Sequence, residues 1–153
     1  MFIVTAKAPK ARALLLGALA VLAVLAAVIL LPRGQASEDG ARVETNEQRI
    51  AYLNALGWEV DAEPVEALTV TLPDTLEEPY RSYNELQRKQ GFDLTPYLGE
   101  TLDRYTYRVT NHPARAAGCQ ADLYVYDGAV VAGDVICTGA NGFIGTLEFP
   151  ANG

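Results

Sequence analysis

The sequence predicts an α+β fold, with two helices packed on one side of an antiparallel sheet that ends in a β-meander. Two segments, Thr45–Gly57 and Pro79–Gly91, carry apolar residues at helical spacing between residues that start and stop helices. From Thr101 the apolar residues alternate with polar ones, which is the period of a half-solvated antiparallel strand. Asp127-Gly128 is a strong turn signal for a hairpin of two further strands. Together these elements form a domain of about 100 residues.

An apolar segment precedes this domain. Residues 13–31, ALLLGALAVLAVLAAVILL, contain neither a charged nor a polar side chain. As a helix they would span about 28 Å, close to the roughly 30 Å hydrocarbon core of a bilayer. We therefore predict a single transmembrane helix and a location in the cell membrane. Secretion after signal-peptide cleavage is the alternative, because Gly34-Gln35-Ala36 is an acceptable cleavage site, although the apolar segment is longer than is usual.

The basic residues around the span predict its orientation. Residues 1–12 contain three basic side chains, whereas only Arg33 and Arg42 follow the span closely. The positive-inside rule therefore predicts a basic cytoplasmic tail at residues 1–12 and an extracytoplasmic C-terminal domain. Disulfides persist in such a compartment.

The part of the chain after the span is acidic. From Gly34 onward, 8 basic and 19 acidic residues give a net charge of −11, compared with −7 for the whole chain. An acidic domain does not attract nucleic acid or anionic lipid headgroups. We expect no nucleic-acid partner, and the charge serves solubility or the binding of a cation or a basic partner.

Residues 32–44, PRGQASEDGARVE, are polar and lack hydrophobic periodicity, so they predict a tether before a folded domain at residues 45–153. At the start of the first helix, Thr45 and Gln48 have the spacing of a capping box. Gly57 supplies the left-handed residue that ends a helix. The buried stripe of this helix is expected at Ile50, Leu53 and Leu56.

The other elements follow from periodicity and turn residues. Val65–Pro73 predicts a strand that ends at the proline. Pro79 suits the first turn of the second helix, and a single helical turn is expected around residues 96–98. A last short edge strand is expected within residues 142–149, GFIGTLEF. The buried stripe of the second helix is expected at Tyr80, Tyr83 and Leu86.

Several segments are similar to a known family. The strings NEQRIAYLNALGWEV, EPYRSYNELQRKQGFDLTPY, RYTYRVTN and GDVICTGANGF resemble domain of unknown function 4830, a family of small membrane-anchored proteins of Gram-positive anaerobes. The start MFIVTAK before a single span is similar as well. The resemblance covers nearly the whole chain and implies a membrane-anchored topology. It implies no activity, cofactor or site residue.

The two cysteines lie at the two ends of the predicted hairpin. With a two-residue loop at Asp127-Gly128, Cys119 and Cys137 fall one residue out of register. A single bulge, for which Gly133 is a natural site, would bring them opposite each other. Facing residues at non-hydrogen-bonded positions approach within disulfide range. We therefore predict an intramolecular disulfide, with a pair of buried reduced cysteines as the alternative.

Four tyrosines on two strands form a candidate binding surface. Tyr105 and Tyr107 share one face of their strand, and Tyr124 and Tyr126 share one face of the next. If these strands pair in a suitable register, the four rings form an exposed aromatic patch for a peptide, a glycan or an envelope protein. The alternative is that the rings pack beneath the helices.

The sequence shows no catalytic or metal-binding constellation. His112 is expected to be a solvated turn residue, and Ser37 and Ser82 lack the contexts of nucleophilic serines. Zinc requires clustered Cys and His ligands, whereas this histidine stands apart from the cysteines. Pairs such as Glu77-Glu78 lack the spacing of a calcium loop. We predict no cofactor, no metal site, no catalytic residue and no enzyme.

The leading hypothesis is a single-pass, extracytoplasmic binding or interaction module without catalysis of its own. This hypothesis rests on the predicted membrane anchor, the tether and a small domain in which no set of catalytic residues is recognisable. One alternative is a cell-envelope enzyme that uses two carboxylates converging in a cleft. The other is a ligand sensor or inhibitor that acts through the tyrosine-rich face of the sheet.

Overall fold

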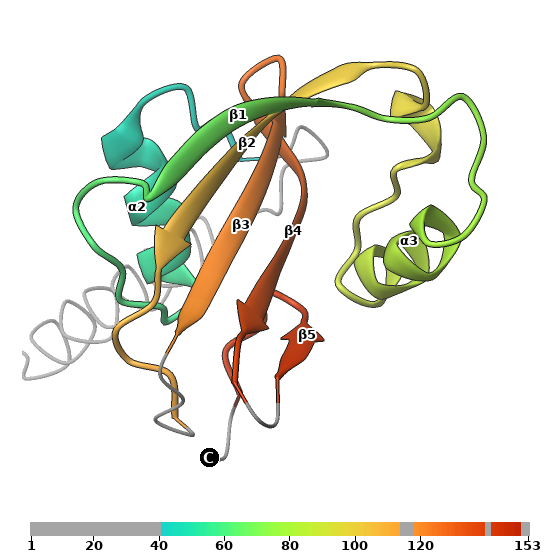
Figure 1. Cartoon of the computed structure of the whole chain (residues 1–153). Coiled ribbons are helices and arrows are strands. Elements are labelled where there is room, and N and C mark those ends of the chain that lie inside the picture. The colour runs from blue at the N-terminus through green and yellow to red at the C-terminus, as the bar shows by residue number, and fades with distance from the viewer. Residues whose placement is uncertain (1–40, 114–117, 140–141, 151–153) are drawn as a thin grey trace, which may run out of the picture. The chain divides into compact units, whose positions relative to one another are not determined.

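The computed structural model describes residues 41–113, 118–139 and 142–150, and Figure 1 shows their arrangement. The core element is an antiparallel sheet of five strands in the order β1-β2-β3-β4-β5, so each strand pairs with the next along the chain. The predicted α+β class and the meander are confirmed. The strands are β1 (Glu66–Thr71), β2 (Thr101–Arg108), β3 (Cys119–Tyr126), β4 (Ala129–Cys137) and β5 (Phe143–Gly145).

Two α-helices and one 3-10 turn accompany the sheet. They are α2 (Asn46–Ala55), α3 (Tyr80–Lys89) and η1 (Thr95–Tyr97). The predicted capping box of α2 is confirmed, because the Gln48 amide donates to Thr45 Oγ1 at 3.3 Å and the Thr45 amide donates to Gln48 Oε1 at 3.0 Å. Gly57 follows α2 with a φ of 100°, as a left-handed C′ residue.

The two helices cover opposite faces of the sheet, so the prediction that both lie on one side is wrong (Figure 1). Directly opposed residues of an antiparallel pair share a face. The pair Tyr105–Leu123 lies on the face that packs against α2, and the pair Arg104–Tyr124 lies on the face beneath α3. The physical reason is visible in β4, where Val130–Val135 is buried without interruption. Continuous burial is typical of a strand that is covered on both faces.

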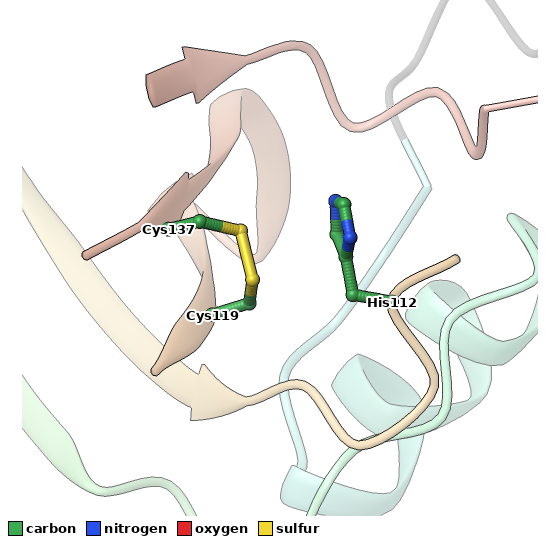
Figure 2. Close-up of side chains that lie close together, drawn as sticks. All are labelled: His112, Cys119 and Cys137. Carbon is green, nitrogen blue, oxygen red and sulfur yellow. A yellow bond between two sulfur atoms is a disulfide. The ribbon is translucent and has the colours of Figure 1, made fainter. Parts of the chain in front are cut away.

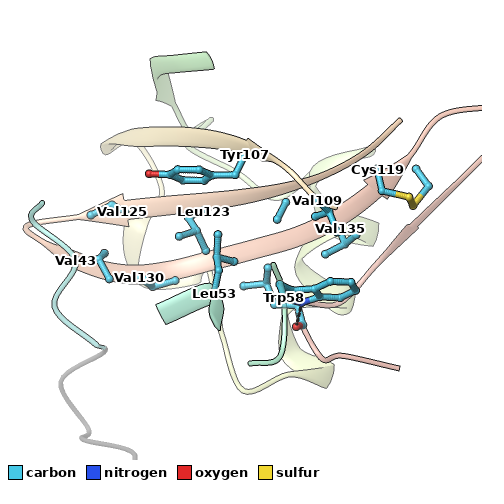
Figure 3. Packing of buried hydrophobic residues seen from close by; sticks show 13 residues of the cluster. Val43, Leu53, Trp58, Tyr107, Val109, Cys119, Leu123, Val125, Val130 and Val135 are labelled. Carbon is cyan, nitrogen blue, oxygen red and sulfur yellow. Dashed lines mark hydrogen bonds between the residues drawn. A yellow bond between two sulfur atoms is a disulfide. The ribbon is translucent and has the colours of Figure 1, made fainter. Parts of the chain in front are cut away.

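The main core lies between α2 and the sheet (Figure 3). Leu53 of α2 is fully buried against this face, and Trp58 is 1% exposed and donates its indole N–H to the Leu147 carbonyl at 2.7 Å. Val43 is also 1% exposed, and its amide donates to the Gly128 carbonyl at 2.7 Å. The folded domain therefore begins before Thr45, and the last residues of the predicted tether belong to it.

The helix α3 docks on the sheet through amide side chains, which corrects its predicted stripe. Its buried residues are Asn84 and Gln87, whereas Tyr80 is 38% exposed. Both ends of the Gln87 amide bond the backbone of Gly133, with N···O distances of 3.0 Å each. A Cβ on Gly133 would lie 2.7 Å from the Asp122 carbonyl and 3.0 Å from Leu147 Cγ, so the packing of Leu147 on β4 requires glycine at this position.

Glycine is also required where the helices end, and two sites form a matched test. Gly57→Ala is expected to destabilise the domain more than Gly91→Ala, in urea unfolding followed by circular dichroism. Both glycines have positive φ, which costs an L-residue about 1–2 kcal/mol. A Cβ on Gly57 would also lie 3.1 Å from the Phe149 ring, whereas a Cβ on Gly91 would meet nothing within 4 Å. Equal losses would mean that Phe149 does not pack over the end of α2.

Within the described ranges, no helix is long and apolar enough to cross a membrane. The predicted transmembrane helix at residues 13–31, the basic tail at residues 1–12 and residues 32–40 of the tether lie outside those ranges.

Candidate functional site

The predicted disulfide between Cys119 and Cys137 is confirmed (Figure 2). The two residues face each other on β3 and β4, with their Cα atoms 4.0 Å apart. The bulge that brings them opposite is not at Gly133. Val125 faces Val130 while Tyr124 faces Ala132, so Val131 is the extra residue of the bulge.

The tyrosines of β2 lie under α2. The Tyr107 hydroxyl accepts a hydrogen bond from Arg49 Nε at 2.9 Å and donates one to Asn46 Oδ1 at 2.8 Å. The Arg49 guanidinium lies 3.7 Å above the centre of the Tyr105 ring. These two rings therefore anchor a helix and are not a free surface.

The tyrosines of β3 lie on the opposite face, so the predicted patch of four rings does not form. Tyr124 packs against Tyr83 of α3 with ring centres 6.0 Å apart, and Tyr126 packs against Tyr97 of η1 at 5.3 Å. The register between β2 and β3 decides this outcome, because a shift of one residue moves a strand's side chains to the other face. The alternative, in which the rings pack beneath the helices, describes Tyr105, Tyr107 and Tyr124, whereas Tyr126 packs against the 3-10 turn.

A pocket of about 360 Å³ lies between α3 and the sheet, and we call it the α3 pocket. Aliphatic side chains of the β1 edge and three tyrosine rings form most of its wall. The guanidinium of Arg104 is the charged group of the lining and forms an ion pair with Glu66. The other lining residues are Val70, Leu72, Pro79, Tyr80, Tyr83, Leu94 and Tyr124.

Two carboxylates converge beneath the α3 pocket. Asp122 and Asp134 face each other across β3 and β4 and are 9% and 2% exposed. The Tyr83 hydroxyl donates to Asp134 Oδ2 at 2.6 Å, and the Thr106 hydroxyl donates to Asp122 Oδ1. Neither carboxylate is part of the pocket wall, whereas Tyr83, which donates to Asp134, is one of the lining residues.

Burial changes the acidity of this cluster. Burial and the neighbouring Asp122 raise the pKa of Asp134 to about 6, and burial raises the pKa of Asp122 as well. Burial, followed by the nearby Asp134, also raises the pKa values of Tyr83 and Tyr124. Both phenols therefore stay neutral and can donate hydrogen bonds at any physiological pH. The cluster holds α3 against the sheet and fixes the orientation of the tyrosine rings in the pocket.

A second pocket, of about 410 Å³, contains His112 in its wall and is called the His112 pocket. The prediction of a solvated turn residue is wrong, because His112 is 9% exposed and its ring stacks on Trp58 at 5.7 Å. The fold also brings this histidine to the two cysteines, from which it stands apart in the sequence. The ring of Phe143 lies 5.5 Å from His112 and completes an aromatic wall.

The acid pair was not among the predicted site residues, although the sequence carries a signal for it. Each aspartate interrupts an apolar strand segment, in CQADLYVY and AVVAGDVIC. Once Cys119 and Cys137 are taken to face each other, Asp122 and Asp134 fall opposite each other at equal steps toward the hairpin loop. A charged residue at two facing positions of a buried hairpin is unusual and could have marked the site.

Comparison with known proteins assigns the family. No curated protein and no solved structure matches the chain. The family model of the domain of unknown function DUF4830 matches residues 52–135, which begin within α2 and end within β4. The matched part includes every residue that lines the α3 pocket and both members of the acid pair. Because the match covers more than half of the 153 residues, the chain belongs to the DUF4830 family.

Proposed function

We propose that this protein is a non-catalytic, membrane-anchored, extracytoplasmic binding module that takes an extended peptide of an envelope protein on the edge of β1. The observation that carries the proposal is the position of the α3 pocket directly beside this edge strand. The apolar segment at residues 13–31 and the basic tail before it support the membrane anchor. The Cys119–Cys137 disulfide supports an extracytoplasmic domain.

The backbone of β1 offers hydrogen-bonding groups to a partner strand. Leu72 donates its amide to the Glu100 carbonyl at 2.9 Å, in register with the pairing of Val70 and Leu102. Hydrogen-bonded and non-hydrogen-bonded pairs alternate along an antiparallel ladder. The N–H and C=O groups of Ala67, Thr69 and Thr71 therefore point away from β2. An extended peptide can pair with them and add a strand to the sheet.

The side chains of β1 are unprotected against such pairing. Five of its six residues are exposed, and Leu68 and the preceding Val65 are 37% and 45% exposed. Edge strands are commonly protected by lysine, proline or a bulge, and Glu66–Thr71 contains neither lysine nor proline. Val70 also forms part of the α3 pocket wall. Alternate side chains of an added strand would therefore lie over this pocket, which supplies specificity.

The charge near the edge indicates the chemistry of the peptide. Glu63, Glu66 and Asp103 are exposed along β1 and β2, on a domain whose net charge is −11 from Gly34 onward, from 8 basic and 19 acidic residues. Opposite charge on the partner speeds association and fixes register. We therefore expect a peptide with apolar or aromatic side chains at alternate positions, flanked by lysine or arginine.

The experiment compares two substitutions of Thr69 in the full-length chain in its native membrane, with a photo-crosslinker at Leu68 to capture the partner. Thr69→Pro removes an outward N–H without touching the β1–β2 bonds, whereas Thr69→Val keeps the N–H and the branched shape. Loss of one hydrogen bond of about 1–1.5 kcal/mol predicts capture reduced about five- to tenfold by the proline, and unchanged by the valine.

The outcomes separate a peptide from a small molecule. A crosslinker at exposed Lys89, at the far end of α3, is the positional control and should capture nothing specific. If Thr69→Pro leaves binding intact while Tyr80→Ala weakens it, the pocket takes a small ligand and the peptide proposal fails. Equal capture from Leu68 and Lys89 would also contradict it.

An enzyme that uses carboxylates is the second candidate, because Asp122 and Asp134 converge near the α3 pocket. A general acid must lie within hydrogen-bonding distance of the reacting group, directly or through one water. Both carboxylates are buried, neither lines the pocket, and Asp134 already accepts a hydrogen bond from Tyr83. The binding module is therefore the better supported function.

A further inference from the structure

Three potential metal ligands meet behind the His112 pocket. One nitrogen of His112 and the sulfur atoms of Cys119 and Cys137 all lie within 4.8 Å of one another. All three residues are buried, and Figure 2 shows the imidazole ring standing beside the disulfide. The chain contains a single histidine and two cysteines, so this cluster gathers every histidine and cysteine of the protein.

We propose that reduction of the disulfide turns this cluster into a binding site for Zn²⁺, with the two thiolates and the imidazole as ligands. The reductant is a dithiol, which transfers two electrons and two protons to the S–S bond and becomes a disulfide itself. The two thiols that form then lose their protons when Zn²⁺ binds, because the thiolate is the metal ligand. The site is closed in the oxidised protein, where each sulfur is bonded to the other.

The geometry of the hairpin suits such a site. A tetrahedral zinc ion with Zn–S bonds of about 2.3 Å holds two sulfurs roughly 3.8 Å apart. Cys119 and Cys137 face each other across β3 and β4 with Cα atoms 4.0 Å apart, so rotation of the side chains alone can separate the sulfurs by that amount. His112 approaches from the loop after β2 and supplies the third ligand.

The surroundings provide access and a fourth position. The His112 pocket, of about 410 Å³, contains His112 in its wall, and Glu148 is another of its lining residues. A water molecule in this pocket can complete the tetrahedron, as in zinc sites with three protein ligands. The rings of Trp58 and Phe143 both pack against His112 and hold its orientation.

The test uses the full-length chain, oxidised or reduced with a phosphine, which does not compete as a thiol ligand. Zn²⁺ is added and the thermal unfolding midpoint is measured, and Co²⁺ serves as a spectroscopic probe of thiolate ligation. We expect Zn²⁺ to raise the midpoint of the reduced chain, and Co²⁺ to give thiolate charge-transfer absorption. The oxidised chain should show neither effect. A reduced chain that is unfolded without metal remains informative, because metal binding then drives folding.

The matched variant is His112→Phe, which keeps the aromatic packing between Trp58 and Phe143 but removes the ligand nitrogen. The oxidised variant should fold with a midpoint near that of the wild type. The reduced variant should bind Zn²⁺ at least about tenfold more weakly than the reduced wild type. Equal affinity of the two reduced proteins would show that the thiols bind zinc without the histidine. Equal binding by the oxidised and reduced wild type would place the ion elsewhere, and either result overturns the proposal.

Discussion

Replacing Trp58 with alanine is expected to destabilise the domain by about 4 kcal/mol, because truncation of a buried tryptophan typically costs 3–5 kcal/mol. The indole is 1% exposed and packs against Phe149 with ring centres 4.7 Å apart. Its N–H donates to the Leu147 carbonyl at 2.7 Å, and the alanine variant leaves this acceptor without its donor. Trp58 therefore joins the segment after α2 to the C-terminal segment after β5.

The measurement is urea unfolding followed by far-ultraviolet circular dichroism, because Trp58 is the single tryptophan and its fluorescence is lost in the variant. Trp58→Phe is the matched control. It keeps an aromatic ring in the core and removes the N–H, so it should cost less than the alanine. A loss below about 1 kcal/mol for Trp58→Ala, which is typical of surface substitutions, would contradict the buried position of the indole.

Local signals in the sequence predicted the elements of this fold well. The capping box of Thr45 and Gln48 and the glycine at position 57 define the two ends of α2. The turn at Asp127-Gly128 and the two cysteines define the register at both ends of the β3–β4 hairpin. Each of these signals acts between residues that lie close in sequence or are linked by a tight turn, so no knowledge of the tertiary structure was needed.

The arrangement of these elements depended on contacts that the sequence does not specify locally. The strands β2 and β3 end and begin at Arg108 and Cys119, so no tight turn joins them, and their register could not be predicted from the sequence. That register places Tyr105 with Leu123 and separates the two tyrosine pairs. The docking face of α3 was missed for another reason, because its buried contacts use Asn84 and Gln87, which a hydrophobic pattern does not identify.

The polar docking of α3 and the acid pair, neither of which was predicted, both belong to the interface between α3 and the sheet. Few apolar side chains of α3 are buried, and Gln87 and Tyr83 attach it to Gly133 and Asp134 through hydrogen bonds. Hydrogen bonds of this kind each contribute about 1 kcal/mol net, which is less than a buried aliphatic side chain. The wall of the α3 pocket is therefore held by polar contacts, and the charge state of the acid pair beneath it influences the stability of the docked helix.

Asp134→Asn is expected to stabilise the domain by roughly 3 kcal/mol at pH 8 and to leave its stability nearly unchanged at pH 4. The pKa of Asp134 is raised to about 6 by burial, against about 3.9 in an unfolded chain. The folded state therefore binds the proton more tightly than the unfolded state. The contribution of Asp134 to stability is most favourable below about pH 4, falls between about pH 4 and pH 6, and is constant above that range, where the buried carboxylate is ionised. Asparagine removes this titration and keeps an oxygen that can accept the hydrogen bond of Tyr83.

The free energy of unfolding in urea, measured for both proteins at pH 4, 6 and 8, tests this expectation, and the exposed turn residue provides the control Asp127→Asn. Titrating groups far from the cluster contribute equally to wild type and variant, so the difference between the two curves reports the titration of Asp134 together with its coupling to Asp122. A variant that is less stable than the wild type at every pH would mean that the ionised carboxylate is needed to hold Tyr83. In that case the negative charge of Asp134 would stabilise the docked helix, and the pKa of Asp134 would not be raised.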